Sequence, residues 1–328
     1  MIIDLHVHYY PDSFVEAITN APGLETYRRD DGRIVVLWRG GVALAVPQPH
    51  PDVAQRIEMM DELGVDRQVL SVPSPSAYFS EGQDAVRVAR DLNDAYAEIV
   101  RDRPDRFHAL AALPMKNVDD AIAELDRSTD ELGLAGTMLL SNIDGELLDS
   151  ARLEPFWERA SERESLVYVH PTLPTVTTGL EDYGLAIALG FFAETNLALA
   201  RLTFSGVFER HAGIRWVFCH AGGTMPFMLP RLDNYYDQFP QCRENISRPP
   251  SEILAGLTYD TATTHVPALK CTCETFGSER LVFGSDYPHI PGGTGPYLDA
   301  VNSLELPDGE RAEMMGGRAL RLLAGQRI

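Results

Sequence analysis

The sequence predicts a single α/β domain over residues 1–328, folded as a (β/α)8 TIM barrel. Short apolar runs typical of buried strands alternate with longer amphipathic stretches typical of helices, and this alternation repeats eight times. The expected strands centre near residues 5, 70, 110, 138, 168, 217, 259 and 283. Eight such units in a chain of this length favour closure into a barrel, with a doubly wound open sheet as the alternative.

The first expected strand, at residues 2–8, is followed by a short helix around 12–19 and then by a long interruption of the pattern. Residues 21–51 are rich in glycine and proline around an apolar centre, Ile34–Trp38, which predicts a hairpin-like excursion. The insertion after the first strand, about 11–50, is expected to lie over the mouth of the active site, because the loops after barrel strands carry function.

From residue 53 onward the pattern is regular, with glycines marking the ends of several helices. A second insertion is expected after the fifth strand, from 172 to about 184. Helices are expected at 53–63, 83–101, 118–132, 153–163, 185–210, 226–237, 266–276 and 308–323, and strands at 68–72, 107–113, 135–140, 166–169, 215–219, 257–261 and 280–284.

Composition limits the classes of partner. The formal net charge of −20 disfavours nucleic acid and anionic membrane surfaces, because both bind basic patches. The chain has no run of about 18 apolar residues, so no membrane span is expected. Its four cysteines lack the spacing of a zinc knuckle or redox pair, and they are expected to be reduced thiols in a cytoplasmic protein. An anionic substrate would need a local cation to bind.

Metal-binding side chains occur where the expected strands end. His6 and His8 alternate with apolar residues in the first strand, so both imidazoles project to the same side. His170 ends the fifth strand, His220 follows the sixth and Asp286 follows the eighth. All strand ends of a barrel meet at one face, which predicts a site for one divalent metal ion. Imidazole and carboxylate ligands suit zinc first, and manganese or another first-row metal next.

A second, bridged metal ion is not expected. Such sites in barrels are often built on a carbamylated lysine of a middle strand, but the only lysines here are Lys116, beyond the third strand, and Lys270, in a helix. The remaining histidines are weaker candidates for the site, expected in loops, at a strand start or at the rim of the pocket: His50, His108, His211, His265 and His289.

Motifs along essentially the whole chain are similar to those of one family. They are Ile-Asp-Leu-His-Val-His at 3–8, Met-Asp at 60–61, Gly-Val-Asp at 64–66, Val-His-Pro at 169–171, Ala-Glu-Thr at 193–195, His-Ala-Gly-Gly at 220–223 and Gly-Ser-Asp-Tyr-Pro at 284–288. In these segments the chain resembles the amidohydrolase superfamily, in the branch around aminocarboxymuconate-semialdehyde decarboxylase. The resemblance implies that His6, His8, His170 and Asp286 bind the metal, with His220 beside it as general acid or base.

The resemblance also bears on substrate binding. Arg231 is similar to an arginine that reaches a substrate carboxylate across a dimer interface, which implies a homodimer; a surface arginine on a helix is the other interpretation. Where that decarboxylase holds a carboxylate with an arginine of the first insertion, this chain has Val36, with Arg33 and Arg39 nearby. A different substrate is therefore expected, with Arg39 as a candidate ligand. Asp286 separates the chain from relatives with glutamate there, which include a hydratase and a carbon–carbon hydrolase.

The sequence therefore predicts a metal-dependent, non-oxidative decarboxylase of a small aromatic or unsaturated carboxylic acid, with His220 and Asp286 as acid and base. Segments 142–145 and 220–224 look like those of relatives that decarboxylate salicylate-type acids. A hydrolase that cleaves a lactone, an amide or a carbon–carbon bond with metal-activated water would use the same residues, and is the alternative. A barrel that keeps metal only for structure is the third hypothesis.

Three aromatic residues are candidates for the wall of the substrate pocket. Phe191, Phe192 and Tyr183 follow the second insertion, and apolar rings at this position would remove water from the carboxylate that leaves. Packing in the core is an equally good explanation for the two phenylalanines.

Overall fold

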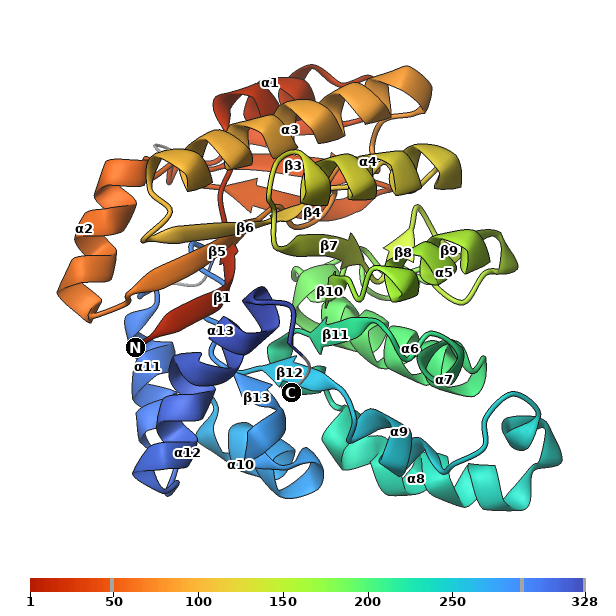
Figure 1. The fold of residues 1–328 in the computed structure, drawn as a ribbon. Helices are drawn as coiled ribbons and strands as arrows, with labels where there is room; N and C mark the ends of the chain where they lie inside the picture. Colours follow the sequence, from red (N-terminus) through yellow and green to blue (C-terminus); the bar gives the residue numbers. More distant parts are fainter. Residues whose placement is uncertain (48–49, 290–291, 327–328) are drawn as a thin grey trace.

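The structure is a computed structural model that describes residues 1–47, 50–289 and 292–326. Eight parallel strands surrounded by helices form a barrel, as predicted (Figure 1). Backbone hydrogen bonds close it: Leu5 N donates to Phe283 O at 2.9 Å, and Asp286 N donates to His6 O at 2.8 Å. In order around the barrel, the strands are β1 (Ile3–His8), β5 (Arg67–Ser71), β6 (Phe107–Ala111), β7 (Gly136–Leu140), β10 (Leu166–His170), β11 (Arg215–Phe218), β12 (Thr258–Asp260) and β13 (Leu281–Val282).

The interior of the barrel is a packed apolar core. Helix α13 (Arg318–Leu323) packs against it with Ala319 and Leu322. Full burial of a side chain of valine or leucine size contributes about 1.5–3 kcal/mol, so this core holds the strand ends in fixed positions. The strand residues in it are Ile3, Leu5, Val69, Leu110, Met138, Leu166, Tyr168, Val217 and Val282, and Cys219 joins them directly after β11.

Local signals place the ends of the surrounding helices. Helix α2 (Val53–Leu63) begins with a capping box, in which Asp52 Oδ1 accepts from Gln55 N and Gln55 Oε1 accepts from Asp52 N. It ends at Gly64, whose φ of 69° is left-handed. Further helices are α1 (Asp12–Asn20), α3 (Gly82–Asp102), α4 (Val118–Asp130), α5 (Glu154–Glu162), α8 (Met225–Gln238) and α10 (Val266–Phe276).

The predicted helix 185–210 is interrupted. It consists of a π-helical turn (Ala186–Gly190), α6 (Phe191–Phe204) and α7 (Val207–Arg210). Gly206 separates the last two with a left-handed φ of 78°. The predicted helix over 308–323 is also divided, into α12 (Asp308–Ala312), a π-helical turn and α13. Elements that were not predicted include α9 (Pro250–Leu254), α11 (Gly295–Asn302) and the hairpin β8–β9 (Asn142–Ile143, Glu146–Leu147).

The first insertion forms a three-stranded antiparallel sheet. The predicted hairpin is β3 (Ile34–Trp38) and β4 (Gly41–Val46). The third strand, β2 (Glu25–Arg28), was not predicted, because all four of its residues are exposed and show no alternation. A Cβ atom on Gly41 would lie 3.0 Å from the side chain of Leu173, which follows the C-terminal end of β10. The sheet therefore lies beside the strand ends that carry the site.

One described stretch, Ala186–Phe204, could cross a membrane by length and composition alone, with a mean hydropathy of 1.2. It does not stand out in the sequence because Glu194 and Arg201 interrupt it. In the fold it belongs to the layer around the barrel, where Leu199 and Leu202 are fully buried in the main core.

Candidate metal centre and active site

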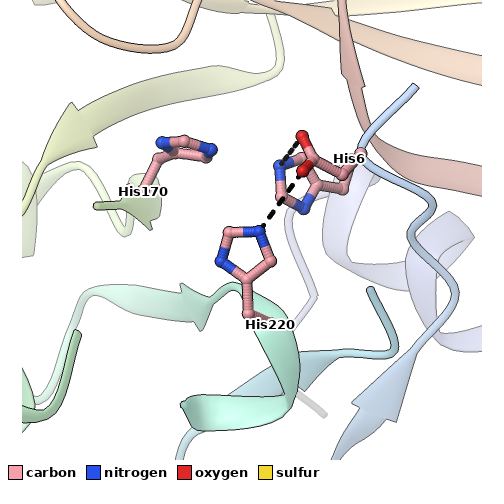
Figure 2. A group of neighbouring side chains, drawn as sticks. His6, His170 and His220 are labelled. Carbon is pink, nitrogen blue, oxygen red and sulfur yellow. Dashed lines mark hydrogen bonds and ion pairs between the residues drawn. The ribbon is translucent and has the colours of Figure 1, made fainter. Parts of the chain in front are cut away.

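Five side chains from four strand ends meet at the mouth of the barrel. His6 and His8 lie at the end of β1, His170 ends β10, and His220 and Asp286 follow β11 and β13. Figure 2 shows the rings of His6, His170 and His220 turned toward a common centre. His220 and Asp286 have positive φ angles of 55° and 58°, which are strained for residues with a side chain and are found most often at functional sites.

Asp286 lies at the centre of this group. Its Oδ1 is 3.0 Å from His8 Nε2 and 3.4 Å from His6 Nε2, and its Oδ2 is 3.5 Å from His220 Nε2. The Nε2 atoms of His6 and His8 are 3.2 Å apart, so two nitrogens converge on one carboxylate oxygen. The rings of His170 and His220 complete the group, with centroids 5.6 Å apart.

The residues present fit a divalent cation. His6, His170, His220 and Asp286 each offer one ligand atom, and these atoms lie within 4.8 Å of one another. Among the described residues, the buried Nε2 of His170 has no hydrogen-bond partner. Leaving such an atom bare is costly, and a metal ion would satisfy it. Three imidazoles and one carboxylate therefore form a divalent-metal site.

The predicted ligands and this closest group differ at one position. His6, His170 and Asp286 belong to both, but His220 stands in the group where His8 was predicted. His8 forms an adjoining group with Asp286 and His289, again within 4.8 Å. Because Asp286 belongs to both groups, His8 and His220 lie on two sides of the same carboxylate.

A buried carboxylate that the sequence did not single out holds His6 in place. Asp260, at the end of β12, has Oδ2 2.6 Å from His6 Nδ1, and the same oxygen accepts a hydrogen bond from the Tyr168 hydroxyl. Its Oδ1 accepts from Ala262 N at 2.9 Å. Such a partner fixes the orientation of a metal-binding imidazole and raises its basicity. The signal was available, because Asp260 ends a barrel strand as the ligands do.

Two other imidazoles are held in the same way. His170 Nδ1 lies 2.7 Å from the carbonyl oxygen of Pro171. His8 Nδ1 lies 3.1 Å from the hydroxyl of Ser71, which in turn donates to Val7 O at 2.8 Å. Each contact engages the Nδ1 of the ring, which leaves Nε2 as the nitrogen that can bind a metal.

Burial and neighbouring charges set the protonation of the site. Burial lowers the pKa of His8 to about 3 and that of His170 well below its ordinary value, so both are neutral. Burial acts in the same direction on His220, but the hydrogen bond and the charge of Asp286 together raise the pKa of His220. Although burial would raise it, the pKa of Asp286 is held well below its usual range by the charge of His6 and by hydrogen bonds from the other two rings.

Two of the three predicted wall residues border the site. The ring centroid of Phe191 is 6.2 Å from that of His170, and the ring centroid of Phe192 is 5.6 Å from that of His220. Tyr183 is 93 % exposed, so its placement in an apolar wall is wrong for the described chain. Its backbone adopts a left-handed turn, with a φ of 57°.

The two predicted arginines lie outside the cluster. Arg39 Nη1 donates to Asn142 Oδ1 at 3.1 Å, and Arg39 Nε lies 3.7 Å from the carboxylate of Asp144. Arg231 is exposed on α8, with its guanidinium carbon 5.4 Å from the ring centroid of Tyr235. Among the described residues, neither arginine pairs with a member of the His/Asp cluster.

The weaker histidine candidates divide into two groups. His289 lies at the site, with Nε2 2.5 Å from the Tyr10 hydroxyl, and His50 Nε2 accepts from Tyr10 N at 3.1 Å. The others are away from the cluster: His108 contacts Arg67, His211 pairs with Glu154, and His265 is exposed.

Comparison with known proteins decides the family. Residues 3–324 match the model of the amidohydrolase family. The chain is 33 % identical over 275 residues to 2-amino-3-carboxymuconate-6-semialdehyde decarboxylase of Dictyostelium discoideum, covering 83 % of this chain and 76 % of that protein. The chain belongs to the amidohydrolase family, in its decarboxylase branch.

Other members of this branch are similar over most of their length. Gamma-resorcylate decarboxylase of Rhizobium sp. (strain MTP-10005) is 32 % identical over 286 residues, covering 81 % of this chain and 85 % of that protein. A dihydroxybenzoic acid decarboxylase from Polaromonas sp. JS666, solved with bound manganese and the inhibitor 2-nitroresorcinol, has a TM-score of 0.82 and 22 % identity, covering 98 % and 96 % of the two chains. This last likeness confirms the barrel fold.

Proposed function

We propose that this protein is a metal-dependent, non-oxidative decarboxylase that releases CO2 from a small aromatic or unsaturated carboxylic acid. The observation that carries the proposal is the convergence of His6, His170, His220 and Asp286 at the mouth of a barrel from this family. The names of the relatives support it, because they act on carboxylated acids such as gamma-resorcylate.

One divalent ion per chain completes the proposed site, zinc first and manganese or another first-row metal next. The manganese in the Polaromonas structure supports a divalent ion. His6, His8, His170 and Asp286 would hold it, with His220 beside it. When bound, such an ion supplies a Lewis acid that stabilises the negative charge left by the breaking carbon–carbon bond.

His220 and Asp286 supply the proton that replaces CO2. Their Nε2 and Oδ2 atoms are 3.5 Å apart, so the pair can hold one proton between them. When the bond to the carboxylate breaks, its electron pair stays on the substrate carbon, and that carbon takes the proton from His220 or Asp286. CO2 and the protonated carbon are the products, and solvent returns a proton to the pair.

Phe191 and Phe192 form the apolar side of the proposed pocket. They begin helix α6, and their rings contact the rings of His170 and His220. An aromatic substrate placed against these rings would exclude water from the carboxylate. This destabilises the charged group and favours its departure as neutral CO2, with the electron pair left on the substrate carbon.

The active unit is proposed to be a homodimer in which Arg231 binds the carboxylate of a substrate held by the partner. Exposed apolar side chains on α8 support an interface there, because Phe227 is 85 % exposed and Tyr235 is 42 % exposed. Arg39 remains a proposed second ligand for substrate oxygen, although Asn142 already accepts from its guanidinium.

A mixing experiment tests the role of Arg231 across the interface. Arg231→Ala and His220→Asn chains, each inactive alone, would form mixed dimers with one complete site, so about a quarter of the normal activity should return. If native mass spectrometry and sedimentation show that mixed dimers have formed but no activity returns, the role of Arg231 across the interface is contradicted.

A cytoplasmic location is part of the proposal. The cytoplasm keeps thiols reduced, whereas secreted proteins generally form disulfides. All four cysteines are free in the structure: Cys219, Cys242, Cys271 and Cys273.

The main test measures bound metal and CO2 release from carboxylated phenols and unsaturated dicarboxylic acids. We expect about one divalent ion per chain, and CO2 release that is lost in His220→Asn while the metal stays bound. Full activity in that variant would contradict the proton-transfer role. Bound metal with hydrolysis of lactones or esters, and no CO2 from any acid, would favour the hydrolase.

A further inference from the structure

We infer that His289, oriented by Tyr10, binds substrate by donating a hydrogen bond from Nδ1 to an oxygen substituent on the acid. This inference rests on the proposed function and narrows its substrate class to acids with a hydroxyl or carboxylate group beside the carboxylate that is lost. Neither residue belongs to the group of His6, His170, His220 and Asp286, and His289 belongs to the adjoining group.

His289 lies beside the metal-binding cluster on the side of His8. Its backbone N donates to Asp286 O at 3.1 Å, and its ring centroid is 5.2 Å from that of His8. Ligand-type atoms of these three residues lie within 4.8 Å of one another. The residue His289 is only partly buried, which leaves part of it open to a molecule in the mouth of the barrel.

Tyr10 determines which nitrogen of His289 is free. Tyr10 is 1 % exposed, and its position is fixed because its backbone N donates to His50 Nε2 at 3.1 Å. A buried tyrosine hydroxyl needs a partner, and here the partner is His289 Nε2, at 2.5 Å. If the hydroxyl donates, the neutral imidazole carries its proton on Nδ1. Among the described residues Nδ1 forms no hydrogen bond, so it can donate to a ligand.

The mouth therefore has a polar side and an apolar side. Phe191 and Phe192 contact His170 and His220, whereas His289 lies next to His8. An aromatic acid with its carboxylate at the cluster would place its ring face against the phenylalanines and a neighbouring substituent toward His289. An oxygen there accepts the Nδ1 hydrogen bond and a methyl group does not. The expected preference is for 2,6-dihydroxybenzoate over 2-hydroxy-6-methylbenzoate.

Binding of two unreactive analogues to the manganese-loaded protein tests this preference. 2-Nitroresorcinol has hydroxyls on both sides of a nitro group that replaces the carboxylate, and 3-methyl-2-nitrophenol has one of them replaced by methyl. One hydrogen bond corresponds to about a tenfold ratio of dissociation constants in favour of 2-nitroresorcinol. The ratio should fall to about one in His289→Leu and should be reduced in Tyr10→Phe. It should be retained in His289→Asn, whose amide nitrogen takes the place of Nδ1.

The matched control is His108→Leu. His108 lies near the start of β6, at the opposite end of the barrel, where its Nε2 is 3.2 Å from Arg67 Nη1. The ratio should be unchanged in this variant. A tenfold ratio in folded His289→Leu would overturn the inference. Equal ratios in Tyr10→Phe and His289→Asn would also overturn it, as would equal affinity of the unmodified protein for the two analogues. Because binding is measured without turnover, a lack of CO2 release would count against the proposed function and not against this ratio.

Discussion

Replacing Asp260 by asparagine should weaken metal binding while the barrel stays folded. Asparagine has the same shape, but it would place an NH2 group where Asp260 Oδ2 now faces His6 Nδ1 at 2.6 Å and the hydroxyl of Tyr168. Donors would then face donors, and His6 would lose its fixed orientation. Removing such a partner typically lowers metal affinity by about 10- to 100-fold, or about 1.4–2.8 kcal/mol.

Competition with a fluorescent zinc chelator measures this loss, and urea unfolding of the metal-free proteins measures stability separately. Glu124→Gln is the matched control, because Glu124 is also a buried carboxylate, accepting from Asn93 Nδ2 at 2.7 Å and Arg127 Nη2 at 2.8 Å on the outer helix layer. This control should lose stability and keep its zinc affinity. A zinc dissociation constant for Asp260→Asn equal to that of the unmodified protein would refute the reasoning.

Three further predictions concern stability. Chelation of the metal should lower the melting temperature. A metal at a hundred times its dissociation constant adds about 2.7 kcal/mol to the free energy of unfolding, and it satisfies the buried Nε2 of His170. Equal melting curves with and without EDTA would contradict this. Gly136→Ala should lower the free energy of unfolding, measured in urea, by about 1–3 kcal/mol, because the new Cβ would lie 2.3 Å from Leu166 O. Gly309→Ala is the control and should not lower it, because no atom lies within 4 Å of that Cβ. Burial lowers the pKa of His50 from 6.5 to about 3, so between these pH values the unfolded chain binds a proton that the folded chain does not. The contribution of the neutral His50 to the free energy of unfolding is therefore complete above pH 6.5 and is lost as the pH falls toward 3. Between pH 7 and pH 5 the stability of His50→Gln should therefore fall less steeply than that of the unmodified protein, and parallel curves would contradict this.

The barrel could be predicted because buried parallel strands require apolar runs. Both faces of strands such as β7 and β10 are covered, and every residue of each is buried. Elements without that signal were missed, as β2 was, since all of its residues face solvent. The break before α7 was missed for a different reason. A Cβ on Gly206 would lie 2.3 Å from Asn245 O, a long-range contact that no local pattern reveals.

The cluster of His6, His8, His170, His220 and Asp286 could be predicted because barrel topology brings strand ends together whatever their spacing in the sequence. Side-chain pairing needs distances that topology does not provide. The partnerships of Asp260 with His6 and of Tyr10 with His289 depend on the positions of single atoms. The error at Tyr183 has a related cause, since an aromatic residue in a turn was expected to be buried.

The most direct test of the account follows the carbon and the proton through one turnover, with mass spectrometry of the organic product formed in D2O and in H2(18)O. Decarboxylation predicts CO2 in an amount equal to the product, one deuterium on the carbon that carried the carboxylate, and no 18O from solvent in the organic product. Organic products that together keep every carbon of the substrate and carry 18O from water, with no CO2 released, would show a hydrolase and contradict the central claim.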